Sequence, residues 1–374
     1  MADRRAFLRQ SARATAALAV GWSPDTSQKL QEVLATGPVA SAEATAADEG
    51  FWRKVRNAFN LEPGLVNLRH VYSPSPRVVI EALEREIERV NGAPSHLAGW
   101  PENGQEPRRE ALRRRAATLL GCDAEELALM RSATEALQTV QLGLDLRAGD
   151  EVLTTNEDYF SMSETWQQRV RRDRIICREV SLLGPYPSSE EIVARFERAV
   201  TPRTRVILFQ HLSWLTGHIL PVREVCLIAR SRGIRTIVDG AHGLGHIPVD
   251  VRQLGCDYYG SSGHKWLMGP LGTGFLYVRR ELIPELWPLM PSFEQMGRDI
   301  RKFEWVGGQS LAGQVAMADA LTFQERLGVD RKAARLRYLK RRWAERLARH
   351  SRVRLFTDLN PTRSCGIGSF SVEG

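Results

Sequence analysis

The sequence has few cysteines and no long apolar segment. Its five cysteines are scattered, without a CxxC pair or a cluster of cysteine and histidine, so it predicts neither a zinc site nor a disulfide framework. No run reaches the roughly 18 apolar residues that a membrane-spanning helix needs, and we expect no membrane span. What remains is a globular chain of 374 residues, whose 43% apolar content suffices for one large core and a smaller lobe.

The chain also lacks a nucleic-acid-binding motif. Its formal net charge of +8 is spread over helices of mixed sign, such as residues 81–89 and 331–349, and basic and aromatic residues do not alternate along it. We therefore expect no nucleic-acid partner, and we interpret the excess arginine as part of solvated helix faces.

The N-terminal residues resemble a twin-arginine export signal. Residues 3–9 have the sequence Asp-Arg-Arg-Ala-Phe-Leu-Arg, and a short, mildly apolar run follows at residues 14–20. The resemblance implies a signal over residues 1–25 and a periplasmic or otherwise exported protein; the alternative is an amphipathic N-terminus of a cytoplasmic protein. Residues 26–48 are rich in small residues and are interpreted as a linker, so the folded part should begin near Glu49.

A lysine in a turn of small residues carries the main chemical signal. Lys265 lies within Ser-Ser-Gly-His-Lys-Trp at residues 261–266, and Asp239 follows the strand pattern of residues 235–238. A desolvated lysine is nucleophilic enough to form a Schiff base with an aldehyde cofactor. A carboxylate beside the pyridine nitrogen of pyridoxal phosphate (PLP) keeps that nitrogen protonated, and acids at the carboxyl ends of parallel strands lie where open α/β sheets bind ligands. Alone, the lysine would be interpreted as a solvated turn residue, but acid and lysine in this order predict a PLP site.

Alternating strands and helices predict an α/β fold with a mainly parallel sheet sandwiched by helices. Beyond residue 281 the pattern becomes helical, notably at residues 314–327 and 331–350, which predicts a second lobe. The predicted strands are residues 127–130, 151–155, 175–180, 206–210, 236–238, 275–278 and 367–372, and the other predicted helices are residues 51–59, 77–90, 108–120, 134–142, 190–199 and 222–231.

With this acid and lysine in place, the chain resembles the class V aminotransferases from about residue 65 to its end. These are fold-type I PLP enzymes that include cysteine desulfurases, serine-glyoxylate aminotransferases and an isopenicillin N epimerase-like branch. Residues 303–310 (FEWVGGQS) and 328–332 (GVDRK) look most like that branch. The resemblance implies an N-terminal segment at residues 49–75, a large PLP-binding domain at residues 76–300, and an incomplete, truncated small domain at residues 301–374.

The resemblance also implies a set of site residues. The amide of Ala133 and the hydroxyl of Thr134 would bind the cofactor phosphate at a helix N-terminus, and an aromatic ring, Tyr159 or its neighbour Phe160, would cover the pyridine. The catalytic residues would be Lys265, Asp239 and His242. The cofactor-binding residues would be Ala133, Thr134, Tyr159, Ser213, Asp239, His242, Ser262, His264 and Lys265, and no residue is expected to bind a metal.

The implied function is that of a PLP-dependent enzyme acting on an amino acid through a lysine aldimine and a quinonoid intermediate, as an aminotransferase or an epimerase-like enzyme, in a homodimer. A β-elimination lyase or desulfurase-like enzyme remains an alternative, although Cys365 comes too early to match the desulfurase persulfide cysteine. A non-catalytic truncated protein of the same fold is another. Relatives bind the substrate carboxylate with an arginine beyond the strand expected at residues 367–372, and Arg69 and Arg363 are conceivable substitutes.

Overall fold

The computed structural model describes residues 41–68, 72–92, 106–182, 187–307, 309 and 311–374. The predicted signal and residues 26–40 of the predicted linker lie outside these residues. The end of that linker is helical instead: α3 (Ala42–Ala46) is capped by Ser41, whose Oγ accepts a hydrogen bond from the Ala44 amide. Trp52 Nε1 donates to the Thr45 carbonyl at 2.8 Å. The folded part therefore includes Ser41 and does not begin at Glu49, because this short helix buries its last turn.

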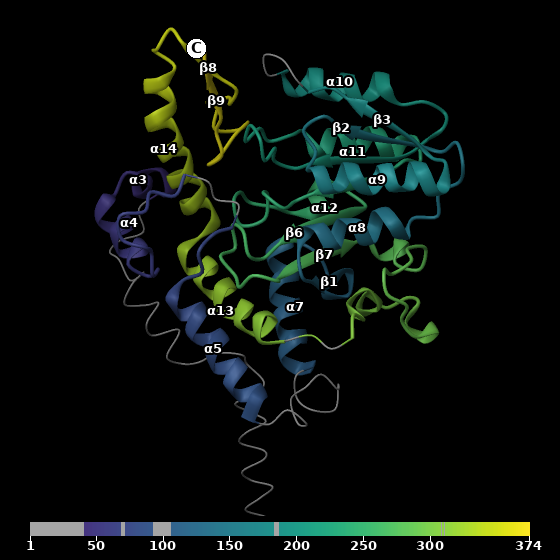
Figure 1. The fold of residues 1–374 in the computed structure, drawn as a ribbon, viewed down its shortest axis with the longest axis horizontal. Helices are drawn as coiled ribbons and strands as arrows, with labels where there is room; N and C mark the ends of the chain where they lie inside the picture. The colour runs from purple at the N-terminus through teal and green to yellow at the C-terminus, as the bar shows by residue number, and fades with distance from the viewer. Residues whose placement is uncertain (1–40, 69–71, 93–105, 183–186, 308, 310) are drawn as a thin grey trace, which may run out of the picture.

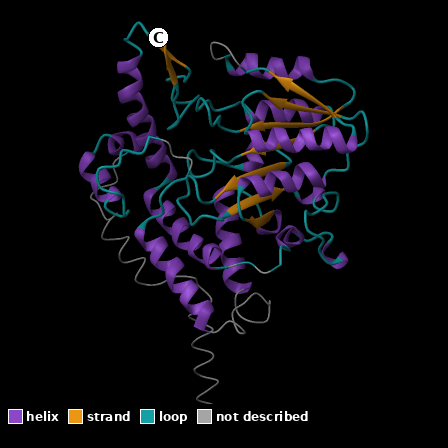
Figure 2. Cartoon of the chain, in the orientation of Figure 1, coloured by secondary structure: helices purple, strands orange, loops and turns teal. Residues whose placement is uncertain are grey.

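The core of the molecule is a seven-stranded sheet in the order β1-β7-β6-β5-β4-β2-β3. Strand β7 is antiparallel to both of its neighbours, and all other adjacent pairs are parallel. The strands form the stacked ribbons of Figure 2. Their bounds are β1 (Leu127–Met130), β2 (Glu151–Thr155), β3 (Ile176–Val180), β4 (Thr204–Gln210), β5 (Arg235–Asp239), β6 (Tyr258–Ser262) and β7 (Gly274–Val278).

Helices cover both faces of this sheet, as Figure 1 shows, and two separate apolar clusters fill the layers between. One cluster joins the sheet to α7, α10, α11 and α13, and the other joins it to α8 and α9. The predicted α/β sandwich is confirmed. Strand β6 and helix α9 are additions that the residue patterns did not predict. The helices are α4 (Glu49–Arg56), α5 (Arg77–Gly92), α7 (Glu106–Leu120), α8 (Ala133–Gly143), α9 (Phe160–Asp173), α10 (Ser189–Ala199), α11 (Val222–Ser231), α12 (Val251–Leu254), α13 (Ala312–Leu327) and α14 (Val329–Leu347), with short 3-10 turns η2 (Ala124–Glu126), η3 (Arg280–Leu282), η4 (Glu294–Met296) and η5 (Ile300–Glu304).

The C-terminal part that stands apart from the sheet begins at α14 and not at residue 301. Segment η5 is tied to β1, because the Glu304 carboxylate accepts from the Leu129 amide at 2.7 Å and pairs with the buried Arg113. Helix α13 contributes Met317 and Leu321 to the core of the large domain. Helix α14 and the two-stranded sheet of β8 (Val353–Leu355) and β9 (Phe370–Val372) form the C-terminal lobe. No helix of the described part combines the length and apolar composition needed to cross a membrane.

Candidate active site

The predicted acid and lysine lie together at the carboxyl edge of the sheet. Asp239 is the last residue of β5 and pairs in register with Gly260 of the neighbouring β6, and Lys265 follows β6 in the next turn. Both side chains line a cavity of about 1060 Å³. The far wall of this cavity comes from the C-terminal lobe, including Trp343 and Leu347 of α14. A cavity of this size, between two lobes and at strand ends, is where α/β proteins bind small ligands.

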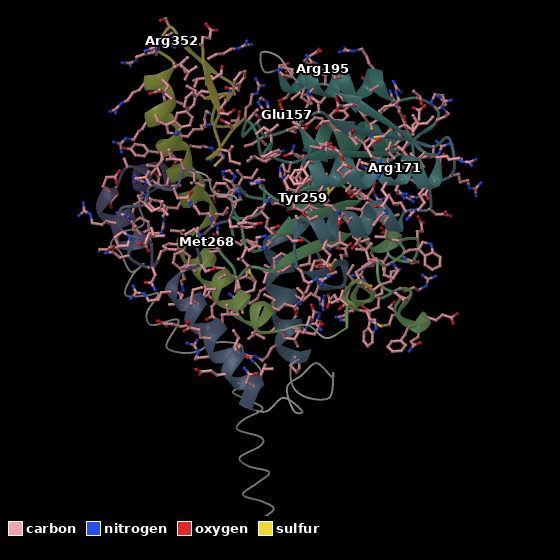
Figure 3. The ribbon with its side chains drawn as sticks, viewed as in Figure 1. Glu157, Arg171, Arg195, Tyr259, Met268 and Arg352 are labelled. Carbon is pink, nitrogen blue, oxygen red and sulfur yellow. The ribbon has the colours of Figure 1, made fainter. Side chains whose placement is uncertain are left out.

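The turn that carries Lys265 is held closed by backbone bonds. The Gly269 amide donates to the Gly263 carbonyl at 2.9 Å, and the Met268 amide donates to the Lys265 carbonyl at 2.9 Å. Met268 has a φ of 60°, in the left-handed region that a non-glycine residue rarely adopts. Its side chain packs against the cluster around Phe323 of α13, which holds this conformation in place, and Figure 3 shows Met268 on the side of α13 and α14. The lysine is therefore presented by a rigid turn.

Burial shifts the pKa of the acid and of the amine in opposite directions. Asp239 is only 5% exposed, and one of its oxygens accepts from the Ala241 amide at 2.9 Å. Burial raises the pKa of the Asp239 carboxyl, against the attraction of Lys265, and burial lowers the pKa of the Lys265 amine, against the attraction of Asp239. A lowered amine pKa increases the fraction of uncharged lysine, which is the nucleophilic form.

His242 connects Lys265 to the following tryptophan. The Lys265 Nζ lies 3.1 Å from His242 Nε2, and Trp266 Nε1 donates to His242 Nδ1 at 3.1 Å. Burial, with the charge of Lys265 and the nearby His246, holds the pKa of His242 well below its usual range, so this ring is neutral. We predicted His242 as a catalytic and cofactor-binding residue, and the structure places its ring beside the lysine. Trp266 had no predicted role.

The N-terminus of α8 also borders the cavity. Ser132 caps this helix, and its Oγ accepts from the Glu135 amide at 3.1 Å. We had predicted that the Ala133 amide binds the cofactor phosphate, but in the structure it donates to Ser262 Oγ at 3.0 Å and is engaged within the protein. The reason is that α8 packs against β6, which turns its first amide toward that strand. Thr134 and the hydroxyl of Ser262 line the cavity and are the groups available to an anion there.

His264 also lines the cavity, with its donor side fixed. Its Nδ1 lies 2.9 Å from the Thr273 carbonyl, which can only accept, so Nδ1 carries the proton. In the neutral ring Nε2 is then an acceptor, and His264 can donate to a phosphate only as the imidazolium. Burial lowers its pKa, which favours the neutral ring, while a bound dianion would favour the charged one.

Aromatic side chains form the wall beside Lys265. The Tyr159 ring lies with its centroid 6.0 Å from Lys265 Nζ, and it contacts Phe160 at 4.3 Å and Trp214 at 5.7 Å between ring centroids. Tyr159 precedes the first residue of α9, so the start of that helix fixes its position. The predicted aromatic cover is thus in the cavity, with Phe160 nearer the solvent.

Ser213 is not brought to the cavity, contrary to our prediction. It is fully buried, and its Oγ donates to Glu157 Oε2 at 2.5 Å. Its neighbours in the turn after β4, Gln210 and Trp214, line the cavity instead. The turn folds back so that the Trp214 amide donates to Gln210 Oε1 at 2.9 Å. Local sequence showed that this strand end faces the site, but it did not show which of the turn residues point inward.

The described part shows one arginine on the cavity wall, Arg131, which pairs with Glu135 and is half exposed. Arg363 is held elsewhere, because it donates to the Pro187 carbonyl at 2.5 Å and pairs with Asp358 at 3.1 Å. Arg69, the other predicted substitute, lies outside the described residues.

Neither a metal nor a cysteine belongs to this site as far as the structure describes it. No group of three or more His, Cys, Asp or Glu side chains among the described residues could hold a metal ion. Cys365 is fully buried, its Sγ donates to the Ala333 and His246 carbonyls, and burial raises the pKa of its thiol.

The residues present fit PLP. The cavity contains an amine of lowered pKa, a buried carboxylate at an adjacent strand end, an aromatic wall, and a helix N-terminus whose dipole favours a phosphate. Those four features match the aldehyde, the pyridine nitrogen, the flat ring and the phosphate of that cofactor.

Comparison with known proteins gives consistent results. The family model described as aminotransferase class-V matches residues 71–374. An isopenicillin N epimerase from Streptomyces clavuligerus is 34% identical over 342 residues, which cover 86% of this chain and 84% of that protein. A probable cysteine desulfurase from Xylella fastidiosa strain 9a5c is 28% identical and covers 90% of this chain and 83% of its own length. A solved C-DES variant, with glycine covalently linked to its PLP cofactor, aligns with a TM-score of 0.71 at 24% identity over 85% of this chain and 86% of that one.

Proposed function

The chain belongs to the class V aminotransferase family of PLP enzymes, and we propose that it holds PLP on Lys265 and moves the α-proton of an amino acid as an epimerase-type enzyme. The observation that carries the proposal is the juxtaposition of Asp239 and Lys265 at adjacent strand ends inside the cavity. The likeness to an isopenicillin N epimerase supports the choice of reaction.

PLP, when bound, supplies an electron sink for the substrate α-carbon. The residues of this chain do the rest. Asp239 would hold the proton on the pyridine nitrogen, since a carboxylate fixed in a buried position stabilises that positive charge. The hydroxyls of Thr134 and Ser262 would bind the phosphate at the start of α8, and Tyr159 would cover the ring. The uncharged Lys265 amine would accept and return the α-proton.

Cys365 does not support the desulfurase alternative. It requires a cysteine that reaches the substrate, and Cys365 is buried among the backbone carbonyls of Ala333 and His246. No cysteine is among the described residues that line the cavity.

The test is an α-proton exchange assay in D2O. The purified protein, loaded with PLP, is incubated with a panel of L- and D-amino acids, and loss of the α-proton signal and inversion of configuration are followed by NMR and chiral chromatography. Exchange with inversion supports an epimerase, whereas oxo-acid formation identifies an aminotransferase. Absence of exchange for every amino acid, in a protein that shows the PLP absorption band, would contradict the proposal. Lys265→Ala is the control, since it removes the proposed base.

We also propose that the chain works as a homodimer. Large apolar side chains around η4 and η5 are exposed in the single chain, including Trp287 at 71%, Phe293 at 52% and Trp305 at 45%. Light scattering should give twice the mass of one chain, and a monomer at micromolar concentration would contradict this.

Export by the twin-arginine route is a further proposal, which rests on residues 1–25 alone. Fusing these residues to a reporter that is active only after export tests it, with lysines in place of Arg4 and Arg5 as the control.

A further inference from the structure

Trp266 is held on several sides by residues from outside its own turn. Its indole ring stacks on the His246 ring, with 3.6 Å between centroids and 15° between planes. Its carbonyl accepts from Lys332 Nζ of α14 at 2.5 Å, and the same amine donates to Gln324 Oε1 at 2.5 Å. The Trp266 side chain is buried, so the indole N–H has a fixed direction.

His246, the stacking partner, is itself fixed. Its Nδ1 lies 2.9 Å from the His242 carbonyl, which can only accept, and its Nε2 accepts from the Gly366 amide at 2.8 Å. The ring is therefore the neutral Nδ1–H tautomer, and burial lowers the pKa of His246 to about 3, which is consistent with that assignment. The His246 ring on which Trp266 stacks therefore carries no charge.

The indole N–H determines the tautomer of His242. A tryptophan side chain can only donate, so His242 Nδ1 must present its lone pair to Trp266 Nε1 at 3.1 Å. The ring is neutral, so its single proton is on Nε2, the atom that lies 3.1 Å from Lys265 Nζ. In that contact His242 is the donor, and Lys265 accepts only as the uncharged amine.

We propose that Trp266 is a positioning residue, which locks His242 as the Nε2–H tautomer and so holds the Lys265 amine in its uncharged, proton-accepting form. The inference rests on the proposed function for its catalytic meaning. The other groups facing this contact are Asp239, whose carboxylate favours the ammonium form of Lys265, and His246, which is neutral. Lys332 lies behind Trp266 and donates to its carbonyl, and burial lowers the pKa of the Lys332 amine to about 7.

The fixed tautomer of His242 affects how Lys265 gives the α-proton back to the substrate. When the Lys265 amine takes up the α-proton it becomes an ammonium, which can only donate, and it then faces the fixed Nε2–H of His242. Rotating the ring to relieve this contact would break the Trp266 bond. The ammonium is therefore disfavoured, and the proton is passed back to the substrate carbon.

The first test is the tautomer of His242 in the cofactor-free full chain, by NMR of protein with 15N-labelled histidine. The Nε2–H pattern is expected for His242 in the wild type, and the Nδ1–H pattern for His246. In Trp266→Phe, which keeps the ring and removes the donor, His242 should shift toward a mixture of tautomers while His246 keeps its pattern. The unchanged His246 signal would show that the pocket is still folded.

The second test is the pKa of the Lys265 amine, from the pH dependence of its acetylation measured by mass spectrometry. Trp266→Phe should raise this pKa by about one unit, because the ring could then accept from the ammonium. Trp305→Phe, a change at an exposed tryptophan that is not among the residues lining the cavity, should leave the pKa of Lys265 unchanged.

A wild-type His242 protonated on Nδ1 would overturn the proposal, and this needs no variant. So would a folded Trp266→Phe protein in which neither the tautomer nor the Lys265 pKa has moved, since a merely structural tryptophan would affect stability alone. Both measurements omit the cofactor and the substrate, so failure of the proposed reaction in the exchange assay is a separate result.

Discussion

The two ends of the cavity are built in different ways. The inner end, around Asp239 and Lys265, is made of adjacent strand ends of one sheet, and its polar groups are buried and hydrogen-bonded. The outer end is lined by apolar side chains from loops and from the C-terminal lobe, and Phe160 and Leu271 are 61% and 70% exposed there. The inner end therefore fixes the chemistry, while the outer end is free to vary with the side chain of the substrate.

The largest effect should come from the inner end. Lys265→Ala removes the amine, so we expect complete loss of the near-visible absorption band of lysine-bound PLP and of α-proton exchange. The cavity around it should persist, because the turn is closed by backbone bonds. Absorption spectra and circular dichroism of both proteins, each mixed with PLP, are the measurements. A lysine-linked band that survives in the variant would show that another amine holds the cofactor.

Asp239→Asn should be the next most severe change. It keeps the shape and removes the charge beside the pyridine nitrogen, so the exchange rate should fall by about 10²–10³-fold, the usual effect of losing one preorganised electrostatic group. PLP should still attach to Lys265. Glu151→Gln is a matched control, because Glu151 is an equally buried carboxylate at the opposite end of the sheet. Equal rate losses in both variants would mean that only stability had changed.

The C-terminal lobe should affect stability in a pH-dependent way. Burial lowers the pKa of Lys332 to about 7, whereas in the unfolded chain a lysine titrates near pH 10.4. Between these values the unfolded state binds one more proton, so the free energy of unfolding should rise with pH, by about 1.4 kcal/mol per unit for this group. Lys332→Met should reduce the slope of the unfolding free energy against pH. Part of the slope should remain, because burial also lowers the pKa of Lys340, to about 8.

Urea unfolding across this pH window measures that slope. The exposed Lys54→Met is the control and should leave the slope unchanged. A wild-type stability that falls as the pH rises from 7 to 10 would have the wrong sign for a buried neutral lysine and would contradict the assignment.

The smallest effect should come from the rim. Phe160→Ser should change the free energy of unfolding by no more than about 0.5 kcal/mol and should leave the PLP band intact. It should weaken the apparent affinity for apolar amino acids by at most about tenfold, which corresponds to ~1.4 kcal/mol. Phe293→Ser, similarly exposed but away from the cavity, should have no such effect. Loss of the PLP band in Phe160→Ser would contradict this expectation and would show that Phe160 helps to bind the cofactor.

Much of the inner end could be predicted from the sequence, because its signals are local. Strands β1 and β2 and helix α11 have the predicted bounds, and the order of Asp239 and Lys265 follows from strands that pair side by side. The differences from the predicted site arose where a side chain or a backbone amide could point either way. Ser213 turned into the protein toward Glu157, and the Ala133 amide turned toward Ser262.

The contacts that orient His242 beside the Lys265 amine could not be predicted, because they join segments that are far apart in the sequence. Trp266 depends on Lys332 and on His246, and His246 in turn depends on Gly366. No pattern near residue 266 contains this information. The short α3 was also missed, since its small residues look like a linker until α14 is in place beside it.

The bond from the Gly366 amide to His246 also has a consequence for biosynthesis. The strands that carry Asp239 and Lys265 leave the ribosome well before residue 366 is made, and folding during synthesis proceeds from the N-terminus. A nascent chain therefore has the amine, the acid and both stacked rings before it has the Gly366 amide that fixes the His246 ring. The contact that fixes His246 therefore forms only after the segment that contains Gly366 has been made.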